Sequence, residues 1–425
     1  MWSVFVVALA AAPASTLDLA HLPGDAGLAD FVWAHAPGLQ AARVRVAAAQ
    51  AEAARARLLP DPSLDMSVNT IPVGPLNPVD LKDPLLNVPN LQAGLSVLLE
   101  VGKRGPRQDA TREAARATAL DALDELRRRT LELEDVLGDV AAAEVRVATL
   151  ERLADDAARL TELQRARADK GDTSALDADR AQLEQEGTWT ALADAREAVA
   201  EGLRLCSERV GVPCLPFASP DKATAYLARR FDGEPADVTQ RPDVRALDAS
   251  QKSAEAARTL AARRVLPDPT LRLGYVHDRF VVSGNQQNSF FIGLSFPLPF
   301  FDRGQVDARA AEVAAASARD AKAALVEGAR SQLERVAAQL ATVDARKARL
   351  RSQSLPLAES VVSRLETAVT RGAAPLQELL LARRTRAELL LTLNDLDRAA
   401  FHLQVERARL TGTGLPLPQE LTDAP

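Results

Sequence analysis

Leu59-Pro60-Asp61-Pro62-Ser63-Leu64 returns almost unchanged as Leu266-Pro267-Asp268-Pro269-Thr270-Leu271, roughly 200 residues further along this 425-residue chain. Proline disfavours a helical conformation in the residue before it, so each copy predicts the end of a helix. An alternation of apolar and polar residues starts directly behind each copy and predicts a strand. The same helix-to-strand junction is therefore expected twice.

Three further landmarks repeat in the same order and at nearly the same spacing. Gly94-Leu95-Ser96 returns as Gly293-Leu294-Ser295, and Arg104-Gly105 returns as Arg303-Gly304. Lys170-Gly171 has its counterpart in Arg371-Gly372. Agreement in both order and spacing predicts an internal two-fold repeat. We therefore expect a first structural repeat, a linker, a second structural repeat and a C-terminal tail, over residues 28–215, 216–235, 236–412 and 413–425.

Long helices are the main elements that the chain predicts. Two of them cover about residues 106–170 and 305–371, and at ~1.5 Å per residue each is on the order of 100 Å long. Apolar residues in both follow a 3-4-3 spacing, which indicates a coiled-coil seam. Shorter helices are expected at about residues 28–58, 175–210, 244–265 and 376–410. The predicted fold class is mainly α with a small β part.

Four short segments alternate with a period of two, at residues 63–69, 91–97, 271–276 and 289–296. Strands with one apolar and one polar face are typical of a barrel wall between lipid and water. They are also typical of a soluble sheet that packs on one side. The long helices offer no broad surface to cover a sheet, which favours the barrel. Four strands are too few to close a barrel, and open edges are not tolerated in lipid. A membrane sheet of this kind therefore requires an oligomer.

Composition excludes several classes of function. The chain carries 52 Lys and Arg against 58 Asp and Glu, a net charge of −6 that provides no basic face for nucleic acid. Four scattered histidines and two methionines argue against a metal centre or another bound cofactor. We find neither a phosphate-binding glycine loop nor a nucleophile elbow, and expect no enzyme and no catalytic residue.

The N-terminus and the two cysteines carry signals of export. The apolar run of residues 4–12 is too short to span a bilayer. Small residues follow it, so residues 1–15 are expected to be a cleaved signal peptide, with a buried N-terminal segment as the alternative. Cys206 and Cys214 are the only cysteines. They either form a disulfide, as an oxidising compartment allows, or remain two unpaired thiols.

Together these motifs resemble the TolC-like outer-membrane efflux proteins over nearly the whole chain. The resemblance is carried by the duplicated Pro-Asp-Pro, by Gly293-Leu294-Ser295-Phe296-Pro297-Leu298-Pro299 and by Leu355-Pro356-Leu357-Ala358-Glu359. Glu100-Val101-Gly102-Lys103-Arg104 looks like the CzcC-type, heavy-metal branch. The resemblance implies a homotrimer in the bacterial outer membrane, with a transmembrane β-barrel to which each chain gives four strands. A coiled-coil α-helical barrel would extend from it into the periplasm.

The resemblance also implies a function and its partners. Such proteins are the passive exit ducts of tripartite efflux systems, and they work with a periplasmic adaptor and an inner-membrane transporter, here most naturally of the RND type. The cargo would be heavy-metal cations. Alternatives are a duct for organic compounds or type I secretion, and a soluble periplasmic coiled-coil scaffold whose strands form a small sheet.

Two helix-turn tips are the candidate sites. In the family the tips dock the adaptor, and the matching residues here are Gly171, Asp172, Thr173, Ser174, Leu176, Gly372, Ala373, Ala374, Pro375 and Leu376. Family channels narrow their pore with acidic residues just after the second tip, and the matching carboxylate here is Glu378. Asp177 holds the equivalent place after the first tip. Ser174 and Asp177 also have the spacing of a helix-capping box, so Asp177 has a structural alternative. The alternative for Glu378 is a position on a solvated helix face.

Overall fold

The computed structural model describes residues 16–71, 73, 83–229, 231, 237–279 and 286–412. The expected signal peptide and C-terminal tail lie outside the described residues. The chain forms two compact units. What we call the helical unit comprises the described parts of 1–44, 120–245 and 324–423, and the sheet unit those of 45–119 and 246–323. Each unit draws segments from both predicted repeats.

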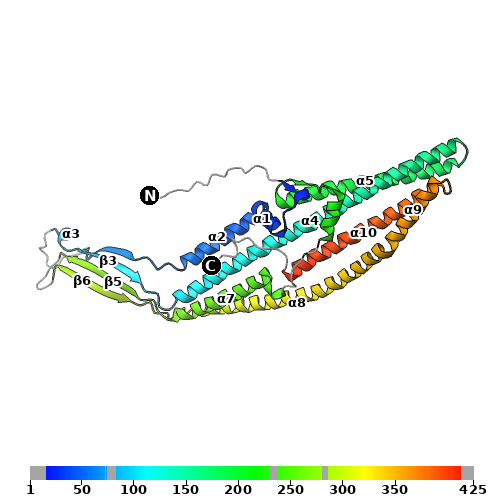
Figure 1. The fold of residues 1–425 in the computed structure, drawn as a ribbon. Helices are drawn as coiled ribbons and strands as arrows, with labels where there is room; N and C mark the ends of the chain where they lie inside the picture. Colours follow the sequence, from blue (N-terminus) through cyan, green and yellow to red (C-terminus); the bar gives the residue numbers. More distant parts are fainter. Residues whose placement is uncertain are drawn as a thin grey trace. The chain divides into compact units, whose positions relative to one another are not determined.

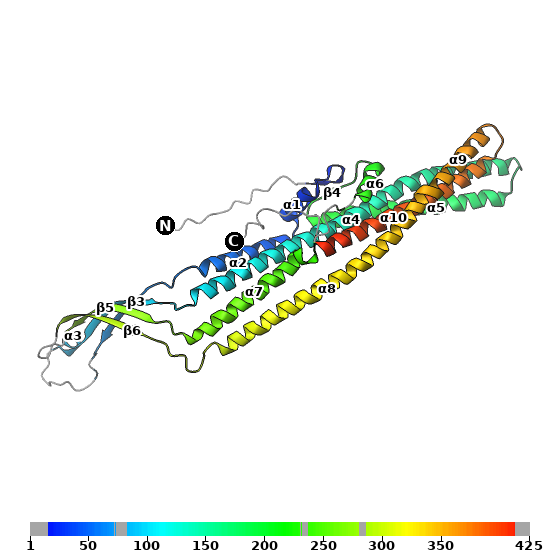
Figure 2. The same ribbon diagram turned by 60° about the horizontal axis from the view of Figure 1, so that its bottom comes forward.

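The sheet unit contains four antiparallel strands in the order β2-β3-β5-β6 (Figure 2). Their bounds are Ser63–Asn69, Asn90–Leu98, Thr270–Asp278 and Asn288–Ser295. These strands lie where the alternation predicted them. Residues in register share one face of the sheet, as Met66, Ala93, Tyr275 and Phe290 do. The short helix α3, Pro84–Asn87, lies in the connection between β2 and β3.

The second Pro-Asp-Pro anchors the strand β3 to the helix that follows it. The Asp268 carboxylate accepts from the backbone N–H of Val101 at 3.0 Å and from Nζ of Lys103 at 2.7 Å. Hydrogen bonds from Lys103 and Val101 hold the pKa of Asp268 below its usual value, although burial opposes them. A nearby ion pair joins Arg107 to Glu100. This pairing explains why the charged residues of the 100–104 motif stand where they do.

Two hairpins of long helices dominate the helical unit (Figure 1). In the first, α5, Ala175–Val210, returns along the later part of α4, which is Arg104–Asp169. In the second, α9, Leu355–Thr370, packs against α10, Leu376–Thr411. Side chains that are almost completely buried include Leu126, Leu133, Leu137, Val140 and Phe401. The core is thus a seam of apolar residues along α4 that meets α10.

The expected first helix is interrupted, which corrects the prediction of one helix over residues 28–58. It forms α1, Asp25–His35, and α2, Leu39–Arg55. The break falls at Ala36, which is extended with φ −62° and ψ 125°. Pro37 follows directly, and proline disfavours the helical conformation of its predecessor. The helix before the second strand pair is α7, Pro242–Ala262, with a 3₁₀ turn over Arg263–Val265.

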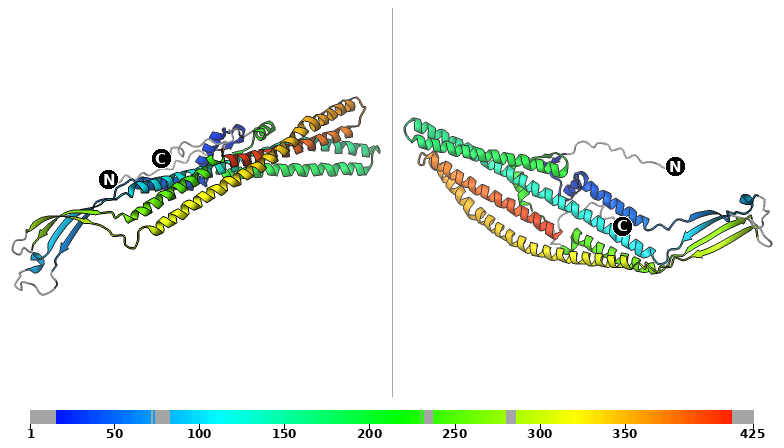
Figure 3. Two further views of the ribbon diagram at one scale, coloured as in Figure 1. Left: turned by 90° about the horizontal axis from the view of Figure 1, so that it is seen from below. Right: turned by 180° about the vertical axis from the view of Figure 1, so that it is seen from behind.

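The second long helix is also not continuous, contrary to the prediction over residues 305–371. A π turn at Leu350–Ser354 separates α8, Gln305–Arg349, from α9. The two helices follow one another along the yellow-to-orange part of the ribbon (Figure 3). Pro356 is the cause that the sequence contains, because it cannot donate to the carbonyl four residues before it and its ring crowds that carbonyl. A wider turn absorbs the missing hydrogen bond.

The segment expected to be a linker contains a helix, α6, Pro220–Ala228. Ser219 caps it and Pro220 occupies its first turn, a start signal that the sequence analysis did not use. Tyr226 and Arg229 both bind the carboxylate of Glu134 on α4, a residue with no exposed surface. This buried charge is therefore neutralised by a residue from the segment 216–235.

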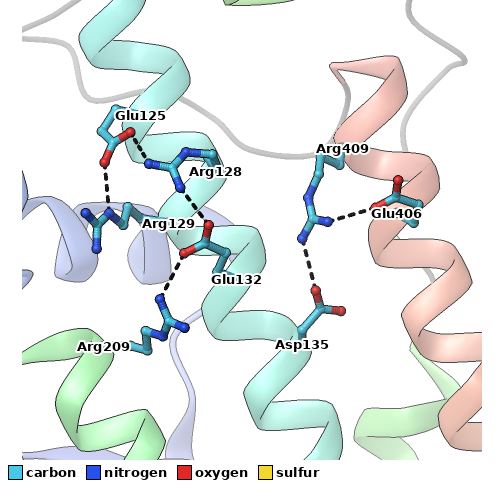
Figure 4. Close-up of polar contacts among 8 residues, drawn as sticks. All are labelled: Glu125, Arg128, Arg129, Glu132, Asp135, Arg209, Glu406 and Arg409. Atoms are coloured by element: carbon cyan, nitrogen blue, oxygen red, sulfur yellow. Dashed lines mark hydrogen bonds and ion pairs between the residues drawn. The ribbon is translucent and has the colours of Figure 1, made fainter. Parts of the chain in front are cut away.

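A ladder of charges lines α4 in the helical unit (Figure 4). Arg128 bonds to Glu132 at 2.8 Å, and Glu132 also accepts from Arg209 near the end of α5 at 3.3 Å. On the side facing α10, Asp135 accepts from Arg409 at 3.0 Å. The ladder ties the ends of α5 and α10 to the same helix.

The remaining elements are short. The strand β1, Leu17–Asp18, pairs in parallel with β4, Cys214–Leu215, and 3₁₀ turns form at Leu19–His21 and Val238–Gln240. Cys206 and Cys214 are joined by a disulfide. Among the helices of the described residues, none combines the length and the apolar character needed to cross a membrane.

Candidate functional site

The first tip is the turn between α4 and α5. Gly171 has a φ of +78°, a left-handed conformation that favours glycine. The Asp172 N–H donates to the carbonyl of Arg167, which closes the end of α4. Ser174 is the N-cap of α5, and its hydroxyl accepts from the backbone N–H of Asp177. The tip is thus a tightly bonded turn whose outer residues are exposed.

The second tip, between α9 and α10, has the same type of turn. Gly372 has a φ of +68°, and the N–H of Ala373 donates to the carbonyl of Ala368. Pro375 is the N-cap of α10 and provides no side-chain hydrogen bond there. Leu376 begins the helix, and Leu379 and Leu380 are buried behind it. Turn chemistry alone accounts for both glycines, and the docking role of the tip residues remains a prediction.

The two candidate gate carboxylates lie in different environments. Asp177 accepts from the hydroxyls of Ser174 at 2.7 Å and Thr173 at 3.1 Å. These bonds lower the pKa of Asp177, with Ser174 the larger cause. Glu378 lies in the first turn of α10, and its side chain is exposed. The contacts of Asp177 are those of a helix cap, whereas Glu378 is available to a solvent-filled space.

A cluster of ion pairs behind the tips was not found by sequence reasoning. Arg383 on α10 binds Asp156 on α4 at 3.0 Å through Nη1 and Glu366 on α9 at 2.8 Å through Nη2. The next residue, Arg384, binds Glu184 on α5. We call Asp156, Glu184, Glu366, Arg383 and Arg384 the bridge cluster. It connects the two helical hairpins about two helical turns from the second tip.

The electrostatics of the bridge cluster favour its charged form. The hydrogen bond that Arg383 donates to Glu366 raises the pKa of Arg383, and the charge of Asp156 acts in the same direction although burial opposes both. Side chains here are partly exposed, so each pair contributes only modestly to stability. Adjacent arginines at 383 and 384 are the one signal in the sequence. Nothing local indicates which carboxylates they meet, because those lie on three other helices.

A groove lies between the hairpins at the same level. It is lined by apolar side chains with the charges of the bridge cluster at its rim: Leu153, Asp156, Ala157, Leu160, Ala181, Glu184, Thr188, Gln377, Leu380, Leu381 and Arg384. Within the part of the chain that the structure describes, no three His, Cys, Asp or Glu side chains gather as a metal site would require. The groove therefore combines an apolar lining with charged groups from both hairpins.

Comparisons with known proteins agree with this architecture. Residues 30–204 match the family model described as outer membrane efflux protein. A curated relative, the cobalt-zinc-cadmium resistance protein CzcC of Cupriavidus metallidurans, is 27% identical over 257 residues. That match covers 59% of this chain and 57% of the relative's own length.

Solved channels share the fold over almost the entire chain. CusC superposes with a TM-score of 0.71 at 16% identity, covering 91% of this chain and 92% of its own. The outer membrane protein VceC of Vibrio cholerae superposes with a TM-score of 0.69 at 18% identity, covering 92% of this chain and 96% of its own. The CmeC outer membrane channel of Campylobacter jejuni superposes with a TM-score of 0.69 at 14% identity, covering 94% of this chain and 89% of its own. Residues 30–204 are thus similar to the outer membrane efflux protein family, and the chain as a whole shares its fold with these solved outer-membrane proteins.

Proposed function

We propose that the chain is the outer-membrane channel of a tripartite efflux system, a passive exit duct without enzymatic activity. It would act as a homotrimer in the bacterial outer membrane and extend into the periplasm. Its partners would be a periplasmic adaptor and an inner-membrane transporter, with the RND type as the natural candidate.

The observation that carries this proposal is the exposed apolar face of the sheet. Met66, Phe290 and Ile292 are 76%, 83% and 76% exposed, and Leu64, Leu273 and Leu294 on the same face are also largely open. A contiguous apolar surface of this size is unfavourable in water. Lipid would cover it, and the sheet would then lie in the membrane with its polar face toward water.

The open edges of the sheet argue for three copies. In the described sheet β2 and β6 each have a neighbour on one side only. Unpaired backbone groups are costly in a bilayer, so both edges would have to find partners. Three chains with four strands each would close a barrel of twelve strands. The likeness to channels of the same fold supports this number.

The helical hairpins would form the periplasmic part of the duct. The tips at Gly171–Leu176 and Gly372–Leu376 would dock the adaptor, which could reach the groove between the hairpins. Glu378, exposed beside the second tip, would contribute one carboxylate per chain to a ring that favours cations. Asp177 would act mainly as a cap, since its oxygens are engaged by Ser174 and Thr173.

Divalent heavy-metal cations are the cargo that we propose. The support is the name of the relative CzcC, a cobalt-zinc-cadmium resistance protein. A carboxylate ring at the narrow end would suit such ions better than anions. Export of organic compounds remains the competing cargo, and growth of a deletion strain with metal salts or with organic toxins separates the two.

Placement of a charge on either face of the sheet tests the proposal. In Ile292→Lys the charge would lie on the lipid side, at a cost of up to about 2–4 kcal/mol near the bilayer centre. We expect loss of the SDS-resistant trimer from the outer-membrane fraction. The matched control, Ser289→Lys on the polar face of the same strand, should retain it. A wild-type protein that purifies as a monodisperse monomer without detergent would contradict the proposal.

A further inference from the structure

Phe291 interrupts the pattern of its strand. Directly paired residues of antiparallel strands share a face, and Phe291 is in register with Gly274, which is in register with Gly94 and then with Asp65. This row therefore lies on the polar face of the sheet, opposite Ile292. Within the described strands Phe291 is the one aromatic residue on that face.

The ring of Phe291 lies across the two glycines of its row. A Cβ atom at Gly274 would lie 2.5 Å from Cε1 of Phe291, and one at Gly94 would lie 3.2 Å from its Cζ. The ring thus extends from β6 over β5 as far as β3. Its side chain is half-buried, and Gly94 beneath it is buried.

Paired glycines in the middle of a sheet need an explanation, because glycine weakens a strand. Close approach of the Phe291 ring is one reason, since a side chain at either position would push the ring away from the sheet. The neighbouring backbone is another, because a Cβ would lie 2.6 Å from the carbonyl oxygen of Ala93 at Gly274 and 3.1 Å from that of Leu273 at Gly94. Gly293, on the same strand and the same face, has no such contact: a Cβ there would meet only the Cβ of Arg272, at 3.9 Å. The fit is therefore specific to the row of Phe291.

Neighbouring positions on this face are small or movable. Ser96 donates to Asp65 at 2.8 Å and lies 2.6 Å from the hydroxyl of Ser63, so these groups stay close to the wall. Arg272, in the next row, is exposed, and its long side chain has several rotamers available. The Phe291 ring, which lies against two glycines, cannot move aside in the same way.

We propose that Phe291 is a specificity-determining residue that sets the width of the duct where it passes the sheet. The inference rests on the proposed function, in which the polar face lines the pore. Gly274 and Gly94 keep the ring flat against the wall, and three copies of the chain place three rings at one level. The size of the hydrated cation or other solute that can pass then depends on this row.

Introduced thiols test whether the position faces the pore. The natural cysteines are joined in a disulfide, so a bulky charged thiol reagent reacts with an introduced cysteine alone. Modification of Phe291→Cys should lower the single-channel conductance of the purified trimer in planar bilayers. In Ile292→Cys, the adjacent residue on the opposite face, the thiol would lie against lipid, out of reach of a charged water-soluble reagent, so the same treatment should leave the conductance unchanged.

Substitutions that move or remove the ring test its effect on width. Phe291→Ala should raise the conductance, and Gly94→Ala should lower it by lifting the ring. In the double variant Gly94→Ala with Phe291→Ala the reduction should disappear, because no ring remains to be lifted. Gly293→Ala is the matched control and should conduct like the wild type.

The outcomes separate this inference from the proposed function. A wild-type protein that forms no channel overturns the proposed function and with it the role of Phe291. A conducting wild type whose conductance is unaffected by Phe291→Ala and by modification of Phe291→Cys overturns the inference alone. In that case the ring would only cover the glycines and stabilise the sheet.

Discussion

At the scale of single residues, His402 shows how neighbouring carboxylates raise the pKa of a side chain. Its ring lies between Asp135, 2.9 Å from Nδ1, and Asp139, 2.7 Å from Nε2. Hydrogen bonds to these carboxylates, Asp135 first, raise the pKa of His402 from 6.5 to about 9. Arg409 and Arg398 bind the same two aspartates. The imidazolium is therefore part of the charged ladder at neutral pH.

The elevated pKa of His402 predicts a pH dependence of stability. A folded-state pKa above the unfolded value stabilises the protein fully below about pH 6.5, and this contribution is lost as the pH rises through about 9. Between pH 7 and pH 10 the melting temperature of the wild type should fall more than that of His402→Gln, as measured by circular dichroism. His21→Gln, a change at an exposed side chain, should behave like the wild type. If the melting temperatures of wild type and His402→Gln fell equally with pH, the charge of His402 would not contribute to stability.

At the scale of elements, the π turn between α8 and α9 is held by one carboxylate. Asp397 on α10 binds Lys347 at 2.8 Å and Arg351 at 2.9 Å, so it spans the beginning of the turn. The residue is only 7% exposed. Removal of its charge leaves a largely buried lysine without this partner, which is more costly than the pair itself is worth.

Asp397→Asn should therefore lower the free energy of unfolding by about 3 kcal/mol. Guanidinium denaturation followed by helical circular dichroism measures the change, and faster amide exchange over residues 350–354 would locate it. Asp395→Asn removes an exposed pair with Arg146, 3.5 Å long, and should cost less than about 1 kcal/mol. Equal effects of the two substitutions would show that the π turn does not depend on Asp397.

At the scale of the whole molecule, the bridge cluster would govern whether the duct is open. Arg383 holds α10 to both α4 and α9, and separation of the hairpins has to break its pair with Asp156, the one of the two that joins the hairpins. In the proposed channel we expect this separation to accompany opening at the periplasmic end. The closed arrangement would owe part of its stability to this one arginine.

Arg383→Gln should therefore favour the open channel, and a loss of about 1 kcal/mol per chain corresponds to roughly a fivefold shift in the equilibrium. Higher conductance and longer open times in planar bilayers are the expected readout. Arg386→Gln, which changes an arginine on the same helix that takes no part in the described ion pairs, is the control. A closed-state lifetime equal to that of the wild type would show that Arg383 does not stabilise the closed arrangement.

Most of the strands and helix ends follow from local patterns in the chain. The alternation in residues 63–69 and 289–296 predicted β2 and β6, and the turns at Gly171 and Gly372 predicted where the long helices end. These signals are local, since a strand repeats every two residues and a glycine with positive φ needs only its own turn. Pro37 and Pro356 carried equally local signals for the helix breaks, which the expected continuous helices overlooked.

The bridge cluster and the row of Phe291 could not be predicted in this way. Arg383 meets Asp156 from 227 positions away, and Phe291 meets Gly94 only because β3 pairs with β5 and β5 with β6. The sequence by itself determined the elements, their order and the two-faced character of the sheet, because each depends on residues within a few positions. Only the tertiary structure decided which charges pair and which glycines lie under the ring, because strand register and helix packing bring together residues that no local pattern connects.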